Sequence, residues 1–286
     1  MTHRDFNTIS PSAKILLRLK ARTDIPFAKE ASAFIKDDTA EPTLSDNAHR
    51  AMFGYLLHFE QRYKTIDSLL KETSATNLLE ISSGFSFRGL QLCTENESVY
   101  YIDTDLPDFI PLKKELVEQL KKDLSLTVKG TLDLQPLNVM QEEQFMQVAD
   151  RFPPGPVTIV NEGLLMYLDE TEKRQLCKTI HTILTKRGGC WITGDIYVKR
   201  QQEHQIPIAD ETPLAEFMQI HNIRDKMFDS FAAAESFFSS CGFTVSRKAT
   251  FDANLLSGLN ILRKQNLTIP DLSRAFQYRE SWVLTV

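Results

Sequence analysis

Apolar residues recur along this chain in two different patterns, and the change between them divides the sequence. Over residues 1–75 they recur at helical spacing, most clearly between about Asp46 and Leu70. The apolar face of that segment carries Met52, Leu56, Phe59, Tyr63, Ile66 and Leu70. Ser10-Pro11 places a capping residue and a proline at the start of an earlier helix. This part of the chain is therefore predicted to be helical.

From residue 78 onward, short apolar runs alternate with helical patterns. The runs predict strands over residues 78–81, 98–105, 126–132, 157–160, 190–193, 243–248 and 280–286. Helices are predicted from about Pro107, over 142–151, from Asp169 to the Gly188-Gly189 pair, and over 231–241. Asp169 and Glu172 have the spacing of a capping box. Such alternation is typical of an α/β fold, in which helices cover both faces of a mostly parallel sheet.

Composition narrows the class of protein. Of the 286 residues, 42% are hydrophobic and 25% are charged, as in ordinary globular proteins, and the length suffices for a sizeable core. The net charge of -5 argues against a general nucleic-acid binder. The cysteines (Cys93, Cys177, Cys190 and Cys241) are scattered, which indicates reduced thiols and no metal site. Because the start lacks an apolar leader and no run reaches membrane length, we expect a cytoplasmic protein without membrane contact.

A glycine turn between two predicted strands is the most informative feature. The strand at 78–81 ends in small residues around Gly84, and the strand at 98–105 ends in Asp105. Such a turn lets a ligand approach the backbone, and such an acid accepts hydrogen bonds from a ribose diol. A pyrophosphate-binding turn needs three spaced glycines, whereas Gly84 stands alone. The arrangement therefore favours a nucleoside without phosphates, above all S-adenosylmethionine, over a nicotinamide dinucleotide.

Three motifs follow one another along the chain: Leu79-Glu-Ile-Ser-Ser-Gly-Phe-Ser-Phe-Arg88, Asp103-Thr-Asp-Leu-Pro107 with Lys113, and Asn161-Glu-Gly-Leu-Leu-Met-Tyr-Leu168. In this order they resemble the leucine carboxyl methyltransferase family, which includes polyketide O-methyltransferases. The resemblance spans about residues 10–195, and Arg88 is closer to the bacterial, polyketide-type branch. It implies S-adenosylmethionine as the cofactor and a Rossmann-like seven-stranded methyltransferase sheet with an N-terminal helical cap.

On this basis residues 1–286 are expected to form a single S-adenosylmethionine-dependent methyltransferase domain. Residues 1–75 would be the helical cap, and residues 76–195 the cofactor-binding core. Residues 196–230 interrupt the alternation of strands and helices with mixed polar and apolar residues and with prolines, so they are predicted to form a lid. Residues 231–286 would supply the C-terminal part of the sheet.

Three residues of the first two strands are candidate cofactor ligands, each with a structural alternative. Asp105 is predicted to bind the ribose, although it could instead cap the following helix. Gly84 would admit the ligand, or simply permit the turn. Glu80, buried in a strand, needs a partner, which could be the methionine ammonium or a neighbouring helix N-terminus. Asp103 is expected to be a structural acid that pairs with Arg88.

Further candidates lie on other predicted elements. Glu162 follows a buried strand, where its carboxylate would face the cationic methionine end of the cofactor. By the resemblance, Arg62 grips the methionine carboxylate and Lys14 lies near the cofactor, although an Arg on a helix is more often a surface residue. The resemblance also places Asp133 and Leu134 against the adenine, with a simple turn residue as the alternative for Asp133.

The predicted reaction is transfer of the sulfonium methyl group to an oxygen. By the resemblance, this oxygen belongs to a carboxylate, or is another oxygen, of a small molecule or of a protein terminus. A carboxylate is already ionised at neutral pH and needs no general base, which fits the lack of a recognisable catalytic constellation. If a base is needed, Tyr167 and His221 are the side chains to suspect. Two alternatives stay open: a nicotinamide-dependent oxidoreductase, and a cofactor-binding protein without catalytic activity.

Overall fold

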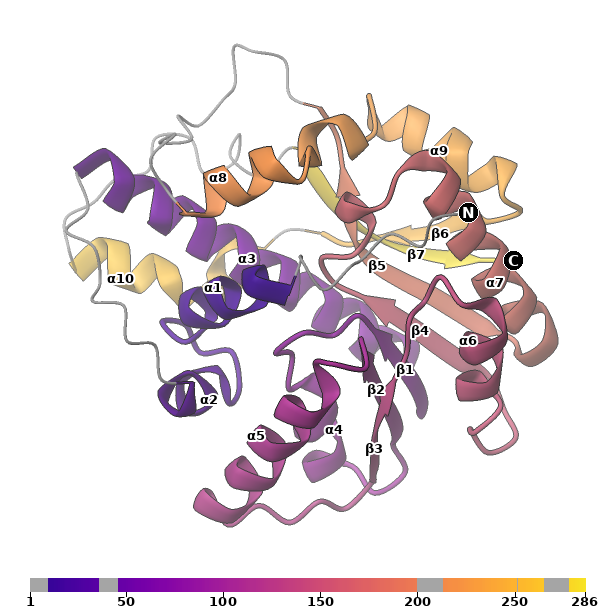
Figure 1. The fold of residues 1–286 in the computed structure, drawn as a ribbon, viewed down its shortest axis with the longest axis horizontal. Helices are drawn as coiled ribbons and strands as arrows, with labels where there is room; N and C mark the ends of the chain where they lie inside the picture. The colour runs from indigo at the N-terminus through magenta and orange to yellow at the C-terminus, as the bar shows by residue number, and fades with distance from the viewer. Residues whose placement is uncertain (1–9, 36–45, 200–212, 251, 265–277) are drawn as a thin grey trace.

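The strands of this protein form one mixed sheet. The computed structural model describes residues 10–35, 46–199, 213–250, 252–264 and 278–286, and within them the sheet has seven strands in the order β3-β2-β1-β4-β5-β7-β6 (Figure 1). The strands are β1 (Asn77–Ile81), β2 (Tyr100–Asp105), β3 (Thr131–Pro136), β4 (Val157–Asn161), β5 (Gly189–Tyr197), β6 (Thr244–Lys248) and β7 (Arg279–Thr285). Strands β1 to β5 pair in parallel, and β7 lies antiparallel between β5 and β6. The predicted Rossmann-like seven-stranded α/β sheet is confirmed.

Helices cover both faces of the sheet. They are α1 (Ser10–Lys20), α2 (Ala28–Phe34), α3 (Asp46–Thr73), α4 (Arg88–Glu95), α5 (Ile110–Asp123), α6 (Glu142–Ala149), α7 (Glu170–Arg187), α8 (Pro213–Ile220), α9 (Phe231–Ser240) and α10 (Gly258–Lys264). Helices α6, α7 and α9 pack on one face around Trp191 and Ile159, and α3 and α4 pack on the other around Ile192 and Val160. Side chains of successive residues in a strand thus pack into cores on opposite faces of the sheet, as the pleat of a strand requires.

Local signals explain where α7 begins and ends. The Asp169 carboxylate accepts from the Glu172 N–H, and the Glu172 carboxylate accepts from the Asp169 N–H, both at 2.8 Å. The predicted capping box therefore forms, which satisfies two backbone donors that the first turn leaves free. Gly188 follows the helix with a φ of 72°, a conformation that favours glycine.

The N-terminal helices lie over the carboxyl ends of the parallel strands. Helix α1 packs against α2, α3 and α8, and α10 packs against α3. Figure 1 shows α1, α3, α8 and α10 gathered at one end of the sheet. Helix α1 meets the residues that follow β1, β2 and β4 there. Because ligands of open α/β sheets bind at this end, the predicted helical cap lies where it can cover a site.

Two predicted strand boundaries are wrong, and both affect the site. The strand predicted over residues 126–132 begins only at Thr131, because Leu126 and Val128 pack against the helical core around α5 and do not join the sheet ladder. The strand predicted to end at residue 193 continues to Tyr197, because its last residues pair with β7. The predicted lid therefore starts inside β5, and residues 200–212 of it lie outside the described residues.

Candidate functional site

A crevice of about 120 Å³ lies where the carboxyl ends of the parallel strands meet. Ser82, Asp105 and Glu162 line it from the ends of β1, β2 and β4, and Ala13 and Leu16 of α1 lie against it. Apolar residues make up most of the remaining wall: Leu106, Phe109, Val139, Met140, Leu164 and Leu168. A mostly apolar wall with a few polar groups is typical of a small-molecule site.

The turn after β1 is held by a contact between Gly84 and Asp105. Gly84 has a φ of 51°, and a Cβ at this position would lie 3.7 Å from the Cβ of Ala13. Its N–H donates to Asp105 Oδ2 at 2.6 Å, and the N–H of Leu106 donates to Oδ1 at 2.7 Å. Burial raises the pKa of Asp105. Asp105 thus bonds the turn after β1 and lines the crevice. It does not cap the following helix, because α5 begins only at Ile110 and has no side-chain cap, so the capping alternative is wrong.

A buried ion pair beneath this turn fixes its shape. Lys113 Nζ donates to Asp103 Oδ1 at 2.7 Å and to Ser83 Oγ at 2.6 Å. The Ser83 hydroxyl donates to the same Asp103 oxygen at 2.5 Å. Burial raises the pKa of Asp103 to about 6, although the Lys113 charge opposes the shift. Asp103 is a structural acid, as predicted, but its predicted pairing with Arg88 is wrong.

Glu162, directly after β4, is the centre of a buried cluster of charges. Its Oε1 accepts from Lys20 Nζ at 2.6 Å and from Arg62 Nε and Nη2, both at 3.3 Å. Its Oε2 accepts from Arg88 Nη2 at 3.1 Å. Burial acts to raise the pKa of Glu162, but the three positive charges outweigh it and hold the pKa well below its ordinary value. Glu162 is therefore an ionised carboxylate on which three cations converge.

Arg88 joins this cluster to two further acids. Its Nη1 donates to Glu80, and its Nε donates to Asp67 Oδ1 at 2.6 Å. Glu80 is fully buried and also accepts from the hydroxyls of Tyr101, at 2.7 Å, and Ser86, at 3.1 Å. These contacts neutralise Glu80 without either of its predicted partners, the methionine ammonium or a helix N-terminus. Glu80 therefore has its partners within the protein, and its role as a cofactor ligand stays a prediction.

Asp195 on β5 shapes the turn after β4, although its position in the sequence did not predict it as a site residue. Its carboxylate accepts from the N–H groups of Gly163 at 2.7 Å, Leu164 at 2.6 Å and Leu165 at 3.0 Å. It also accepts from Asn161 Nδ2 at 2.7 Å, and only 2% of the residue is exposed. The missed signal was an acid at a strand end, but the strand was predicted to stop two residues earlier.

The two basic residues predicted on the helical cap have different surroundings. Arg62 is buried on α3 and contacts Glu162, so it is not the surface residue of the structural alternative. Lys14 has an exposed side chain, whereas Lys20, on the same helix, is buried against Glu162. At about 100° per residue, positions 14 and 20 lie on different faces of α1. Lys20, and not Lys14, therefore reaches the charge cluster, and the position of Lys14 near a cofactor stays a prediction.

The corrected position of β3 also moves the residues expected near an adenine. Asp133 accepts from Arg151 Nη2 at 2.9 Å, and Leu134 is buried in the core beneath the helical cap. Neither is among the described residues that line the crevice, because the strand continues past them. Asn138 and Val139 follow the true end of β3 and line the crevice instead. The placement of Asp133 and Leu134 at the strand end is wrong.

Tyr167 connects the crevice to the described part of the predicted lid. The residue is buried and lines the crevice, and its hydroxyl donates to Ser12 Oγ at 3.4 Å. Its ring packs edge-to-face against Phe217 and His221, with centroids 6.1 and 6.5 Å away. Burial raises the pKa of Tyr167, which keeps its hydroxyl protonated at neutral pH. His221 contacts the crevice wall through this ring.

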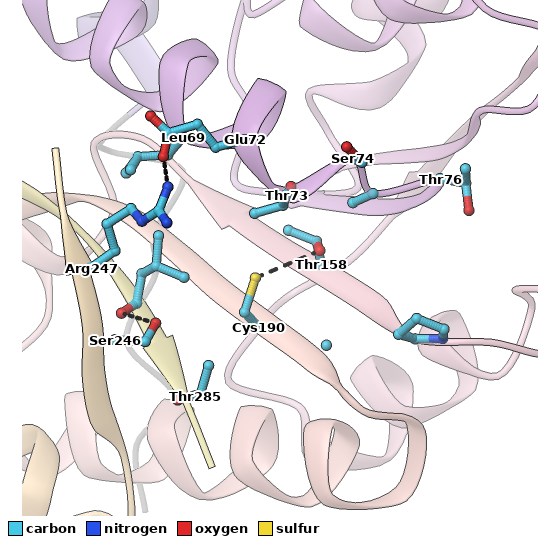
Figure 2. Close-up of a pocket in the computed structure, with 14 residues that line it drawn as sticks. Leu69, Glu72, Thr73, Ser74, Thr76, Thr158, Cys190, Ser246, Arg247 and Thr285 are labelled. Carbon is cyan, nitrogen blue, oxygen red and sulfur yellow. Dashed lines mark hydrogen bonds and ion pairs between the residues drawn. The ribbon is translucent and has the colours of Figure 1, made fainter.

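A larger cavity, of about 450 Å³, lies near the amino ends of β4 and β5. Figure 2 shows Thr158 and Cys190 in it, joined by a contact of 3.7 Å between Oγ1 and Sγ, together with the Glu72–Arg247 ion pair. Ligands of open α/β sheets bind at the carboxyl ends of the strands. The smaller crevice beside Gly84 is therefore the candidate site.

The described residues show neither a metal-binding cluster nor a membrane-spanning helix. All four cysteines are free thiols. Across the described ranges, no group of His, Cys, Asp and Glu is arranged to hold a metal ion. In the same part of the chain, no helix combines the length and the apolar character needed to cross a membrane.

Comparison with known proteins gives structural likeness only. No protein-family model matches the chain, and no curated protein matches it. A DUF574 family protein from Streptomyces avermitilis is similar in structure, with a TM-score of 0.61, 15% identity and 96% of each chain covered. Magnesium protoporphyrin IX methyltransferase from Synechocystis with bound SAH gives a TM-score of 0.48 and 9% identity over 92% of this chain and 96% of that one. At such identities, the likeness to the Streptomyces protein establishes a shared fold and says nothing of activity.

Proposed function

We propose that this protein transfers a methyl group from S-adenosylmethionine to an oxygen of an acceptor. The crevice carries the proposal, because its two ends suit the two halves of this cofactor. One end has the lone-glycine turn and the Asp105 carboxylate, which suit a nucleoside without phosphates. The other has Glu162 among three cations, which suits an α-amino acid with one charge of each sign. By the resemblance of its motifs, we place the chain with the leucine carboxyl methyltransferase family, nearer the polyketide-type branch.

The nucleoside would lie between the turn and the residues after β3. Each Asp105 oxygen accepts one backbone N–H and keeps a further lone pair for a ribose hydroxyl. The adenine would lie against Val139 and the Phe109 ring, in the place first expected beside Asp133 and Leu134. Gly84 would let the ribose approach the backbone.

The amino-acid end would enter the Glu162 cluster. The guanidinium of Arg62 can grip the methionine carboxylate, and the Glu162 carboxylate can hold the ammonium. Lys20 belongs to α1 and bonds Glu162 directly, so this helix closes one side of the cluster. Because the three cations are already present without a ligand, the site is preorganised for a zwitterion.

The nicotinamide-dependent oxidoreductase fits this protein less well. Nicotinamide-binding folds of the classical type have the strand order 3-2-1-4-5-6 and a three-glycine turn. This sheet carries an antiparallel strand between β5 and β6, and its turn has Gly84 alone. A cofactor-binding protein without activity would show binding but no methyl transfer to any acceptor.

The acceptor would reach the methyl group beneath the helical cap and the lid. We propose that residues 1–286 act as one domain, with Phe217 and His221 as parts of a lid that contacts the crevice through Tyr167. Positive charge leaves the sulfur as the methyl group moves, so alignment of donor and acceptor is the main requirement. A carboxylate acceptor needs no base, and we propose this class.

We expect S-adenosylhomocysteine to bind and NAD or NADP to bind much more weakly, because no glycine-rich turn cradles a pyrophosphate. Titration calorimetry of the purified protein measures each affinity. In Asp105→Ala, the affinity for S-adenosylhomocysteine should fall by about 1–3 kcal/mol, the usual loss of a charged acceptor. An exposed acid outside the crevice, changed as Asp123→Ala, provides the matched control. Tighter binding of a nicotinamide dinucleotide would overturn the proposed function.

The product should be a methyl ester. A carboxylate is fully ionised between neutral and mildly alkaline pH, so the rate should be nearly flat there. A phenol or alcohol acceptor needs a base, and its rate would climb with pH. With a labelled methyl group, the product formed from a candidate carboxylic acid should release labelled methanol in mild alkali. An alkali-stable product would contradict the carboxylate assignment and leave the broader methyltransferase proposal standing.

A further inference from the structure

A chain of hydrogen bonds leads away from Arg62 behind the candidate site. Arg62 Nη1 donates to the Tyr197 hydroxyl at 3.1 Å. That hydroxyl lies 2.8 Å from His58 Nε2, and His58 Nδ1 lies 3.0 Å from the Tyr278 hydroxyl. Tyr197 and His58 are both buried, with 3% and 6% of their surface exposed. None of these three aromatic residues was singled out in the sequence.

The direction of these bonds follows from the donors. Because the guanidinium can only donate, the Tyr197 oxygen accepts from Arg62. Among the described residues, the remaining partner for the Tyr197 proton is His58 Nε2, which must then be the acceptor. His58 therefore carries its proton on Nδ1 and donates it to Tyr278. The imidazole is neutral, and the chain runs from Arg62 to Tyr278 in one direction.

The same contacts leave part of Arg62 free for a ligand. A guanidinium has five N–H bonds. Each nitrogen uses one N–H in the described contacts: Nε and Nη2 donate to Glu162, and Nη1 donates to Tyr197. One N–H on Nη1 and one on Nη2 are left over, and a pair of N–H groups on the two Nη atoms can bind a carboxylate in bidentate fashion.

Two glycines let the backbone pack closely against the Arg62 side chain without a Cβ that would crowd it. Gly163 lines the crevice, and a Cβ there would lie 3.1 Å from Arg62 Nη2 and 3.4 Å from Nη1. At Gly194, a Cβ would lie 3.1 Å from Arg62 Cγ and 2.8 Å from Ile66 Cδ1. The Phe59 ring lies 5.0 Å from the guanidinium carbon. Arg62 is therefore packed on both sides, and Tyr197 sets its rotation.

We propose that Tyr197 and His58 are positioning residues for the amino-acid end of the cofactor. His58 accepts the hydrogen bond that the Tyr197 hydroxyl donates, and this orients the lone pairs of that hydroxyl toward Arg62. This fixes the two remaining N–H groups of Arg62 toward the crevice, where they bind an α-amino-acid carboxylate. The inference rests on the proposed function, and it adds a set of residues that act through Arg62 and touch no cofactor atom themselves.

Two probes separate positioning from general stability: S-adenosylhomocysteine, and 5′-methylthioadenosine, which is the same nucleoside without the amino-acid part. In Tyr197→Phe, affinity for S-adenosylhomocysteine should fall about 3- to 10-fold, the range for loss of one hydrogen bond. Affinity for 5′-methylthioadenosine should not change. His58→Leu should behave in the same way, and His58→Gln, whose carbonyl can accept the Tyr197 proton, should recover part of the loss.

Calorimetry of both probes, with a thermal unfolding curve for each variant, distinguishes the outcomes. Equal losses for the two probes, or no loss for S-adenosylhomocysteine in a folded Tyr197→Phe protein, would overturn this inference and leave the proposed function intact. A wild-type protein that binds neither probe would overturn the proposed function together with the inference. If His58→Leu does not fold, the isosteric Tyr197→Phe still decides the question.

Discussion

Arg88→Met is expected to lower the free energy of unfolding by about 3–5 kcal/mol, the usual cost of breaking a buried ion pair from one side. Arg88 is 1% exposed and donates to three acids, Glu80, Asp67 and Glu162. Without it, Glu80 keeps only hydroxyl partners in a fully buried position. Urea unfolding followed by circular dichroism, with linear extrapolation to water, measures the change.

Two variants test this explanation. Adding Glu80→Gln to Arg88→Met should recover part of the lost stability, because it removes the buried negative charge that the first change leaves unpaired. Lys178→Met breaks an exposed pair with Glu142 and should change the stability little. An Arg88→Met protein as stable as the wild type would show that the cluster contributes nothing to folding.

Asp195→Ala is expected to lower the free energy of unfolding by about 2–4 kcal/mol and to weaken cofactor binding as well. The carboxylate accepts from three consecutive backbone N–H groups, those of Gly163, Leu164 and Leu165. Each buried donor left without a partner costs about 1–3 kcal/mol, and relaxation of the turn recovers part of this. The turn begins at Glu162, so a relaxed turn would also displace the charge cluster.

Asp195→Asn is the matched control, because it keeps the volume and replaces one accepting oxygen by an NH₂ group. It should lie between the wild type and Asp195→Ala in both unfolding free energy and affinity for S-adenosylhomocysteine. Denaturant unfolding and calorimetry measure the two quantities. If Asp195→Ala lost affinity but kept full stability, Asp195 would act on the ligand and not on the turn.

Local patterns in the sequence predicted most of the secondary structure. Helical spacing located α3, and the Asp169–Glu172 pair located the start of α7, because both signals depend on neighbours along the chain. The strand at 126–132 was misplaced for a related reason. Leu126 and Val128 are of residue types that a buried strand often contains, but their side chains pack against helices. An apolar run shows that residues are buried, and it does not show what covers them.

The partners of buried charges could not be read from the sequence. Arg88 is close in sequence to Glu80 but was assigned to Asp103, which instead bonds Lys113. A buried charge needs a partner within a few ångströms, and which partner it finds depends on how the helices pack on the sheet. For the same reason the sequence pointed to Lys14 and not to Lys20. The packing of α1 decides which of its faces meets Glu162.

By itself, the sequence determined the ends of β1 and β2, the lone-glycine turn at Gly84 and the acid at the end of β2, because parallel strands bring such ends to one edge wherever their helices lie. The tertiary structure alone decided that Lys20, Arg62 and Arg88 share one carboxylate, and that Tyr197 and His58 stand behind Arg62. The reason is that charge pairing and hydrogen-bond direction act through space over a few ångströms, whereas residues 20, 62, 88 and 162 are far apart along the chain.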